Sequence, residues 1–185
     1  MKRFTCGACG NAVFFDNSAC TGCGAALAFD PETLAMIAVA PDDPRHCANR
    51  AYAVCNWLAP PGVAFCTACA LNDMIPDLSI VANVERWRAL EAEKRRLVYA
   101  LLRLGLPLTP RSADPGGLAF AFLADTAPSF TERGRVLTGH AAGLITINIA
   151  EADPAAREAM RDQMDEPYRT LLGHFRHESG HHYWD

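Results

Sequence analysis

The residues whose types and spacing best suit a chemical reaction lie near the end of the chain. There His177, Glu178 and His181 form a His-Glu-x-x-His pattern. If this segment is helical, residues i and i+4 share one face, so the two imidazoles can bind one zinc ion. Glu178 then lies beside the open coordination position, where a carboxylate can take a proton from metal-bound water and pass it to a leaving amine. The pattern predicts zinc-dependent hydrolysis of peptide or amide bonds, with Glu178 as the catalytic residue.

A hydrolytic zinc site needs a third protein ligand, and little sequence follows His181. Asp185 stands four positions after His181 and can reach the metal if the helix continues that far. Because the chain ends there, we expect a truncated or shortened polypeptide whose third ligand is missing, is Asp185, or comes from a neighbouring chain. The alternative interpretation is a surface group of histidines that includes His174 and has no catalytic metal.

A second source of metal chemistry is the cysteines: all eight lie between residues 6 and 69. Two Cys-x-x-Cys pairs, each followed by glycine, supply the first set: Cys6, Cys9, Cys20 and Cys23. Each pair offers two thiolates from one tight turn, and four thiolates satisfy a tetrahedral zinc ion. The repeated spacing predicts a structural zinc site in a zinc ribbon. A redox pair or a rubredoxin-like iron site is the rival interpretation.

The remaining cysteines predict a second structural zinc site. Cys66 and Cys69 form another Cys-x-x-Cys pair, and its partners must come from upstream. Cys47 and Cys55 complete the simplest set of four ligands, although His46 could replace Cys47. Alternatively, Cys47 or Cys55 is a buried free thiol.

The elements that must position these groups follow from hydrophobic spacing and capping signals. Ile145, Ile147 and Ile149 alternate with less apolar residues, as in a strand with one buried face, and that strand could hold a substrate as an added strand at a sheet edge. The expected elements are a helix from an N-cap at Asn83 to Leu104, ended by Gly105; strands over 118–124, 135–138 and 143–150; a helix from Asp153-Pro154 to Met164; and a final helix that begins at Asp165 or Glu166.

Several stretches resemble the bacterial family of zinc-binding metallopeptidases with N-terminal zinc ribbons. They are 168–178 with Gly180-His181 and Tyr183-Trp184-Asp185; 138–148 with Glu151-Ala152-Asp153; and 55–58 with Cys66 and Cys69. The resemblance covers essentially the whole chain and implies a zincin-like peptidase. Ser179 and His182 depart from its pattern, since we expect a bulkier aliphatic and an aromatic residue there.

Together these observations predict an α+β protein with two parts. Residues 1–80 form a tandem zinc-ribbon module with sites within 6–23 and 47–69. Residues 81–185 form part of a zincin-like domain with a small antiparallel sheet and the His-Glu-x-x-His helix. The expected cofactor is Zn²⁺, two ions structural and one catalytic if its site is complete. The alternative to an enzyme is a non-catalytic protein-interaction module.

Charge and composition restrict the partners and the cellular location that we expect. The formal charge is -4, and two tetrathiolate zinc sites would make it about -8, so the charge disfavours nucleic acid as a partner. No apolar run is long enough to cross a membrane, and no signal peptide precedes Cys6, so we expect a cytoplasmic protein. The expected partner is a peptide or protein substrate, or a protein partner. The sequence leaves the oligomeric state open.

Overall fold

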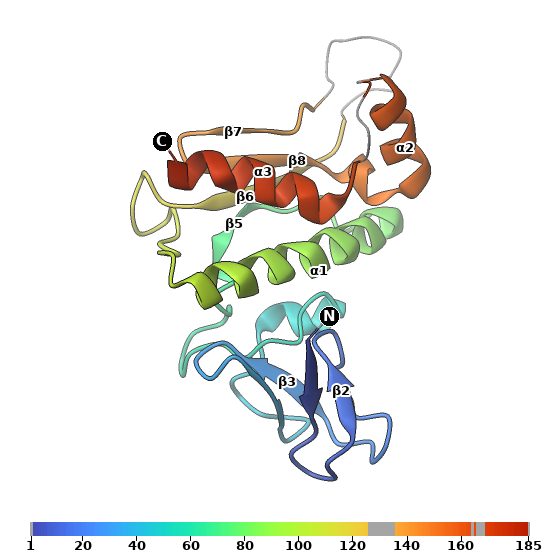
Figure 1. The fold of residues 1–185 in the computed structure, drawn as a ribbon, viewed down its shortest axis with the longest axis vertical. Helices are drawn as coiled ribbons and strands as arrows, with labels where there is room; N and C mark the ends of the chain where they lie inside the picture. The colour runs from blue at the N-terminus through green and yellow to red at the C-terminus, as the bar shows by residue number, and fades with distance from the viewer. Residues whose placement is uncertain (1, 126–135, 164, 166–168, 185) are drawn as a thin grey trace.

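Helix α1 lies between the cysteine-rich hairpins at one end of the molecule and a mixed sheet with helix α3 at the other (Figure 1). The structure is a computed structural model and describes residues 2–125, 136–163, 165 and 169–184. Its elements in chain order are β1 (Arg3–Thr5), β2 (Ala12–Phe14), β3 (Leu27–Asp30), β4 (Ala35–Ala38), η1 (Ala48–Tyr52), η2 (Cys69–Leu71), β5 (Asn72–Met74), α1 (Val81–Leu104), β6 (Ala119–Leu123), β7 (Gly139–Ala141), β8 (Leu144–Asn148), η3 (Ile149–Ala152), α2 (Pro154–Gln163) and α3 (Leu171–Trp184). The predicted α+β class, with cysteine clusters typical of zinc ribbons, is confirmed.

The strands of the N-terminal hairpins are too short to form a large core of their own. Aromatic side chains supply packing between the hairpins and the rest of the molecule. β1 pairs with β2, and β3 pairs with β4, both antiparallel. Phe29 of β3 packs on Trp57 with ring centroids 4.5 Å apart. Phe15 lies 5.3 Å from the ring of Tyr99 on α1. The ribbons therefore share one hydrophobic core with α1.

Helix α1 starts three residues earlier than its sequence signals suggest. Its N-cap is Ile80, so the prediction of an N-cap at Asn83 is wrong. The Asn83 side chain is buried and donates a hydrogen bond to the Asp77 carbonyl, which stabilises the approach to the helix. The predicted end is confirmed, because Gly105 caps the helix with a φ of 68°.

The four-stranded sheet has the order β5-β6-β8-β7 and is mixed, so the prediction of an antiparallel sheet is wrong. β6 runs parallel to both β5 and β8, and only β7 and β8 form an antiparallel pair. The long connection between β6 and β8 allows the parallel crossover, which a tight turn would not. β5 precedes residue 80 and still belongs to this sheet. The ladder therefore joins the cysteine-rich segment to the second half of the chain.

The strand boundaries differ in part from expectation. β6 and β8 lie within the predicted ranges 118–124 and 143–150, and Ile145, Ile147 and Ile149 are buried as predicted. The strand expected at 135–138 instead forms at β7, and residue 135 lies outside the described residues. β8 is paired on both sides, so it cannot accept a substrate strand; the free edge on this side belongs to β7.

The last two helices are positioned by side-chain caps. The Asp153 carboxylate accepts a hydrogen bond from the Ala155 N–H at 2.8 Å, in agreement with the predicted start of α2. Helix α3 begins at Leu171, several residues after the predicted start; Asp165 is in a turn, and residue 166 lies outside the described residues. The Thr170 hydroxyl accepts the Gly173 N–H at 3.0 Å, so this local cap sets the start of α3.

Candidate metal centres and active site

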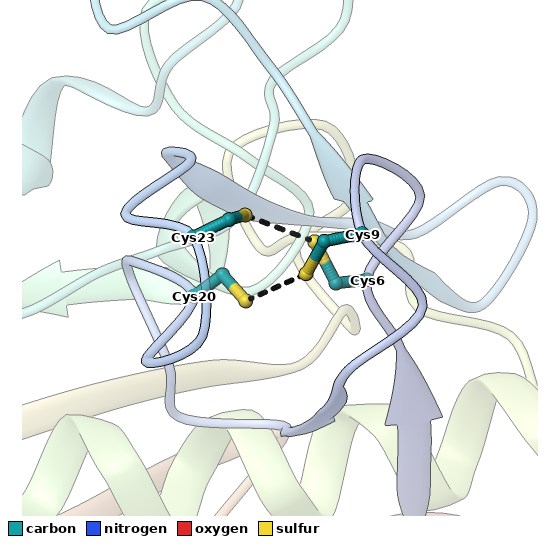
Figure 2. A group of neighbouring side chains, drawn as sticks. All are labelled: Cys6, Cys9, Cys20 and Cys23. Atoms are coloured by element: carbon teal, nitrogen blue, oxygen red, sulfur yellow. Dashed lines mark hydrogen bonds between the residues drawn. The ribbon is translucent and has the colours of Figure 1, made fainter.

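The first cysteine set gathers at the tips of the ribbon loops (Figure 2). The Cys9 and Cys20 sulfurs are 3.6 Å apart, and those of Cys6 and Cys23 are 4.0 Å apart. A tetrahedral zinc ion with bonds of about 2.3 Å places its sulfur ligands about 3.8 Å apart, whereas a disulfide holds them at about 2 Å. The spacing therefore fits a four-thiolate metal site.

The backbone of this set also favours thiolates. N–H groups of Cys23 and Gly22 donate to the Cys20 sulfur and lower the pKa of its thiol to about 6. The glycines that follow the two pairs, Gly10 and Gly24, have φ values of 76° and 75°, which a side chain would disfavour. The two turns bring the four sulfur atoms within 4.8 Å of one another, as a zinc ligand set requires.

The second set, Cys47, Cys55, Cys66 and Cys69, is buried throughout. The Cys55 and Cys66 sulfurs are 3.6 Å apart, again close to the edge of a tetrahedral zinc site. Burial raises the pKa of the Cys66 thiol, so thiolates here need a bound cation to compensate their charge. The His46 ring instead contacts the Ala40 carbonyl at 3.2 Å and is not part of the set.

A buried ion pair on α1 borders the second set. The Glu91 carboxylate and the Lys94 ammonium are both fully buried and 2.8 Å apart. One Glu91 oxygen lies 4.0 Å from the Cys69 sulfur, and the other accepts hydrogen bonds from Asn72 and Trp87. Burial raises the pKa of Glu91, although the charge of Lys94 opposes this shift. No sequence signal indicated this pair, because Glu91 and Lys94 resemble ordinary charges on a solvated helix face.

The candidate active-site histidines project from α3. The Nε2 atoms of His177 and His181 are 3.3 Å apart, which matches the edge of about 3.3 Å expected for two imidazoles on one tetrahedral zinc ion. Both side chains are exposed, and Glu178 is half-buried. The opposite face of α3 fixes the helix on the sheet through Phe175, whose ring lies 5.7 Å from that of Phe120 on β6.

β7 brings a third histidine to this helix. The His140 ring stacks on that of His181, with centroids 6.0 Å apart and planes inclined by 11°. Its Nε2 atom accepts the Gly143 N–H at 3.0 Å, which orients the ring. His182 lies against His140, and burial together with the charge of His140 lowers the pKa of His182. The sequence around His140 carries no signal for this contact, because the two histidines are far apart along the chain.

Among the described residues, only the two cysteine sets bring three or more metal-ligating side chains together. His140 is therefore too far from the pair to complete a three-ligand group. Asp185, the predicted third ligand, lies outside the described residues. In the described part of the chain, His177 and His181 are therefore a pair of candidate ligands without a third beside them.

His174 of α3 is held by a buried carboxylate. Its Nδ1 atom lies 2.7 Å from a Glu151 oxygen, and Arg169 lies 3.1 Å from the other oxygen. Burial alone would raise the pKa of Glu151, but contacts with His174, Thr138 and Arg169 lower it overall. This cluster ties the start of α3 to η3. His174 is thus engaged with a carboxylate one turn before His177.

Comparison with known proteins agrees with this arrangement. Residues 83–185 match the family described as "Putative zinc-binding metallo-peptidase", and residues 3–80 match a zinc-ribbon domain. The chain belongs to this metallopeptidase family. Uncharacterized proteins from Mycobacterium bovis and from two strains of Mycobacterium tuberculosis are 43% identical to it over 188 residues, which cover 100% of the chain and 53% of each relative. The chain thus spans about half the length of these curated relatives. No solved structure matches it.

Membership in the family confirms the resemblance inferred from the sequence, and it identifies zinc as the metal of the protein. The cysteine sets have the donor type and spacing of structural zinc sites. Among the described helices, none combines the length and apolarity that a membrane crossing requires.

Proposed function

We propose that this member of the metallopeptidase family hydrolyses peptide bonds, with His177 and His181 as metal ligands and Glu178 as the proton-transferring residue. The observation that supports the proposal most directly is the 3.3 Å separation of the two Nε2 atoms on one face of α3. A zinc ion bound there would polarise a carbonyl group and lower the pKa of a water molecule. The two cysteine sets would bind the structural zinc ions.

Glu178 is the residue that we assign to proton transfer. It precedes His181 by three positions on α3, so it is a neighbour of the histidine pair on the helix, and it is half-buried. A carboxylate there can accept a proton from the attacking water and deliver it to the leaving amine. Phe175 and the Glu151–His174 contact would keep the helix in place while the proton moves.

The substrate would lie along β7. This strand is at the edge of the sheet, and His140 on it stacks against His181, so an added peptide strand would run beside the histidine pair. Main-chain hydrogen bonds would hold such a peptide with little dependence on its sequence. We therefore propose a peptide or protein substrate bound in an extended conformation. Asp185 remains our candidate for the third ligand.

Zinc content and hydrolysis, measured together, test this proposal. Elemental analysis of the purified chain should give close to three zinc ions, falling to two in His177→Ala. Glu178→Gln should keep three ions and lose about 10²–10⁴-fold of the rate of zinc-dependent hydrolysis of a quenched fluorescent peptide library. Retained hydrolysis in Glu178→Gln would refute the assigned role.

One observation favours a second candidate function, a protein-interaction module without catalysis. His177 and His181 are exposed, and the described residues offer no third ligand. In that case both the unmodified chain and His177→Ala would contain two zinc ions, and neither would hydrolyse the library. This result would replace the peptidase proposal.

A further inference from the structure

A groove of about 740 Å³ lies between the first zinc ribbon and helices α1 and α3, on surfaces that the proposed hydrolysis does not use. Phe4 and Phe15 come from the ribbon, Ala100 and Leu104 from α1, and Leu172 from α3. The volume is within the range of about 300–1,000 Å³ typical of ligand sites. Neither the family match nor the cysteine sets assign it a role.

Most of the aromatic and aliphatic side chains that line the groove form its apolar floor, and one leucine beside them is exposed. Phe4 and Phe15 are buried beneath it, and Tyr99 lies beside them on α1. Leu104 stands at the end of α1 with 72% of its surface exposed. An apolar ligand side chain would bury surface on this floor and gain the corresponding hydrophobic free energy.

Four cations, Lys2, Arg96, Arg103 and Arg176, line the groove against one acidic lining residue, Glu93. The Lys2 ammonium lies over the Phe4 and Tyr99 rings, 4.9 and 5.7 Å from their centroids, whereas the three guanidinium groups come from the helices. This positive excess occurs in a chain whose formal charge is -4, so the groove differs in sign from the molecule as a whole. Arg96 contacts Glu93 and Asp16. Arg103 and Arg176 are exposed and have no ion-pair partner among the described residues.

We propose that this groove binds an acidic segment of another polypeptide, with apolar side chains on the floor and carboxylates at the rim. Charge complementarity selects an anionic occupant. The lining residues on α1 extend from Glu93 to Leu104, about 16 Å of helix, which equals the length of about five extended residues. The cations come from the residue before β1, from α1 and from α3, so they match several carboxylates along a chain better than a single anionic headgroup.

The first zinc site contributes to the groove. Phe4 is in β1, two residues before Cys6. Phe15 follows β2, which lies between the two cysteine pairs in the chain and pairs with β1. The metal-bound ribbon would therefore hold one wall of the groove in place. Recognition here is separate from the histidine pair, and it does not require hydrolysis.

Calorimetric titration with a synthetic probe tests the proposal in the Glu178→Gln background, which prevents cleavage. The probe is an unlabelled octapeptide in which glutamate pairs alternate with Leu-Phe pairs. We expect saturable binding with one peptide per chain, weakened by added salt. Two control peptides, one with lysine in place of glutamate and one with serine in place of Leu-Phe, should bind at least tenfold more weakly.

Charge reversal locates the binding. Arg103→Glu with Arg176→Glu should weaken the probe about tenfold or more, because two attractive contacts become repulsive. The matched control is Arg86→Glu with Arg111→Glu, which changes the net charge equally at residues outside the groove. It should alter the affinity by less than about twofold. Ala100→Trp keeps the charge and should block the floor, and zinc content verifies that every variant is folded.

Three results would overturn the proposal. Equal weakening by the two charge-reversal pairs would mean that the probe responds only to net charge. Loss of binding in His177→Ala would place the peptide at the histidine pair instead of the groove. Binding of dodecanoate without binding of the acidic peptide would make the groove a site for a small amphipathic anion. Failure of hydrolysis alone would leave the titration result unchanged, so the two proposals are tested separately.

Discussion

Replacing Lys94 by methionine should destabilise the protein by about 3–5 kcal/mol, because the Glu91 carboxylate would lose its counter-charge inside the core. Both side chains are fully buried, and their charged atoms are 2.8 Å apart. Methionine is chosen because Lys94 packs over the rings of Phe120 and Phe122, with its Nζ atom 5.7 and 5.5 Å from their centroids. A thioether keeps much of that contact and removes only the charge.

The double variant Glu91→Gln/Lys94→Met separates the charge from the packing. With both charges removed, no ion remains unpaired, and the glutamine oxygen can still accept hydrogen bonds from Asn72 and Trp87. We expect its stability to return to within about 1–2 kcal/mol of the unmodified chain. The single variant Glu91→Gln completes the cycle, and the double variant should cost less than the sum of the two single variants because the two charges are coupled.

Urea unfolding at a fixed zinc concentration measures these differences. With a slope of about 2–3 kcal/mol per molar, the single variant should lower the midpoint by about 1–2 M at an unchanged slope. The exposed pair Arg88–Glu85 provides a control, since Arg88→Met should cost less than about 1 kcal/mol. If Lys94→Met costs no more than Arg88→Met, the carboxylate is not desolvated and the reasoning is refuted.

Three further perturbations test other parts of the structure. Cys66→Ser should remove one zinc ion from the folded chain and lower its thermal midpoint, as elemental analysis and calorimetry would show; unchanged zinc content would exclude Cys66 as a ligand. Phe175→Ala should cost about 3–5 kcal/mol in urea unfolding, because the ring is fully buried against β6, whereas Phe14→Ala, at a 45% exposed side chain, should cost under about 1 kcal/mol. Glu151→Gln should destabilise at neutral pH, and thermal unfolding should show the deficit shrinking with acid: the pKa of Glu151 is lowered in the folded state, so its contribution is present above the unfolded pKa of about 4.3 and is lost as pH falls through the folded pKa. A deficit that stays constant down to the acid limit would contradict this assignment.

Features that depend on short-range geometry were predictable from the amino-acid sequence. The Cys-x-x-Cys spacing predicted which thiols could share a metal, because each pair belongs to one tight turn. The four-residue interval between His177 and His181 predicted that their rings would meet, since a helix places such residues on one face. Gly105 marked the end of α1 for the same local reason, and the alternation of isoleucines marked β8.

Element boundaries predicted from the local sequence were wrong where a contact with a distant or preceding segment set the boundary instead. Asn83 is a residue type that favours the N-cap position. Its side chain instead donates a hydrogen bond to the Asp77 carbonyl, and the helix begins before it. The strand expected before residue 139 formed slightly later. There the turn at Ala142 and Gly143, both with positive φ, sets the pairing of β7 with β8.

The way in which distant segments combine could not be predicted from local sequence patterns. The parallel pairing of β6 with β8, and the addition of β5, depend on which faces α1 and α3 bury, and no short-range pattern carries that information. The contact of His140 with His181 and the burial of Glu91 with Lys94 arise in the same way. A histidine or charged residue has the same local spacing whether it faces solvent or a partner across the fold. Its environment is therefore set by packing.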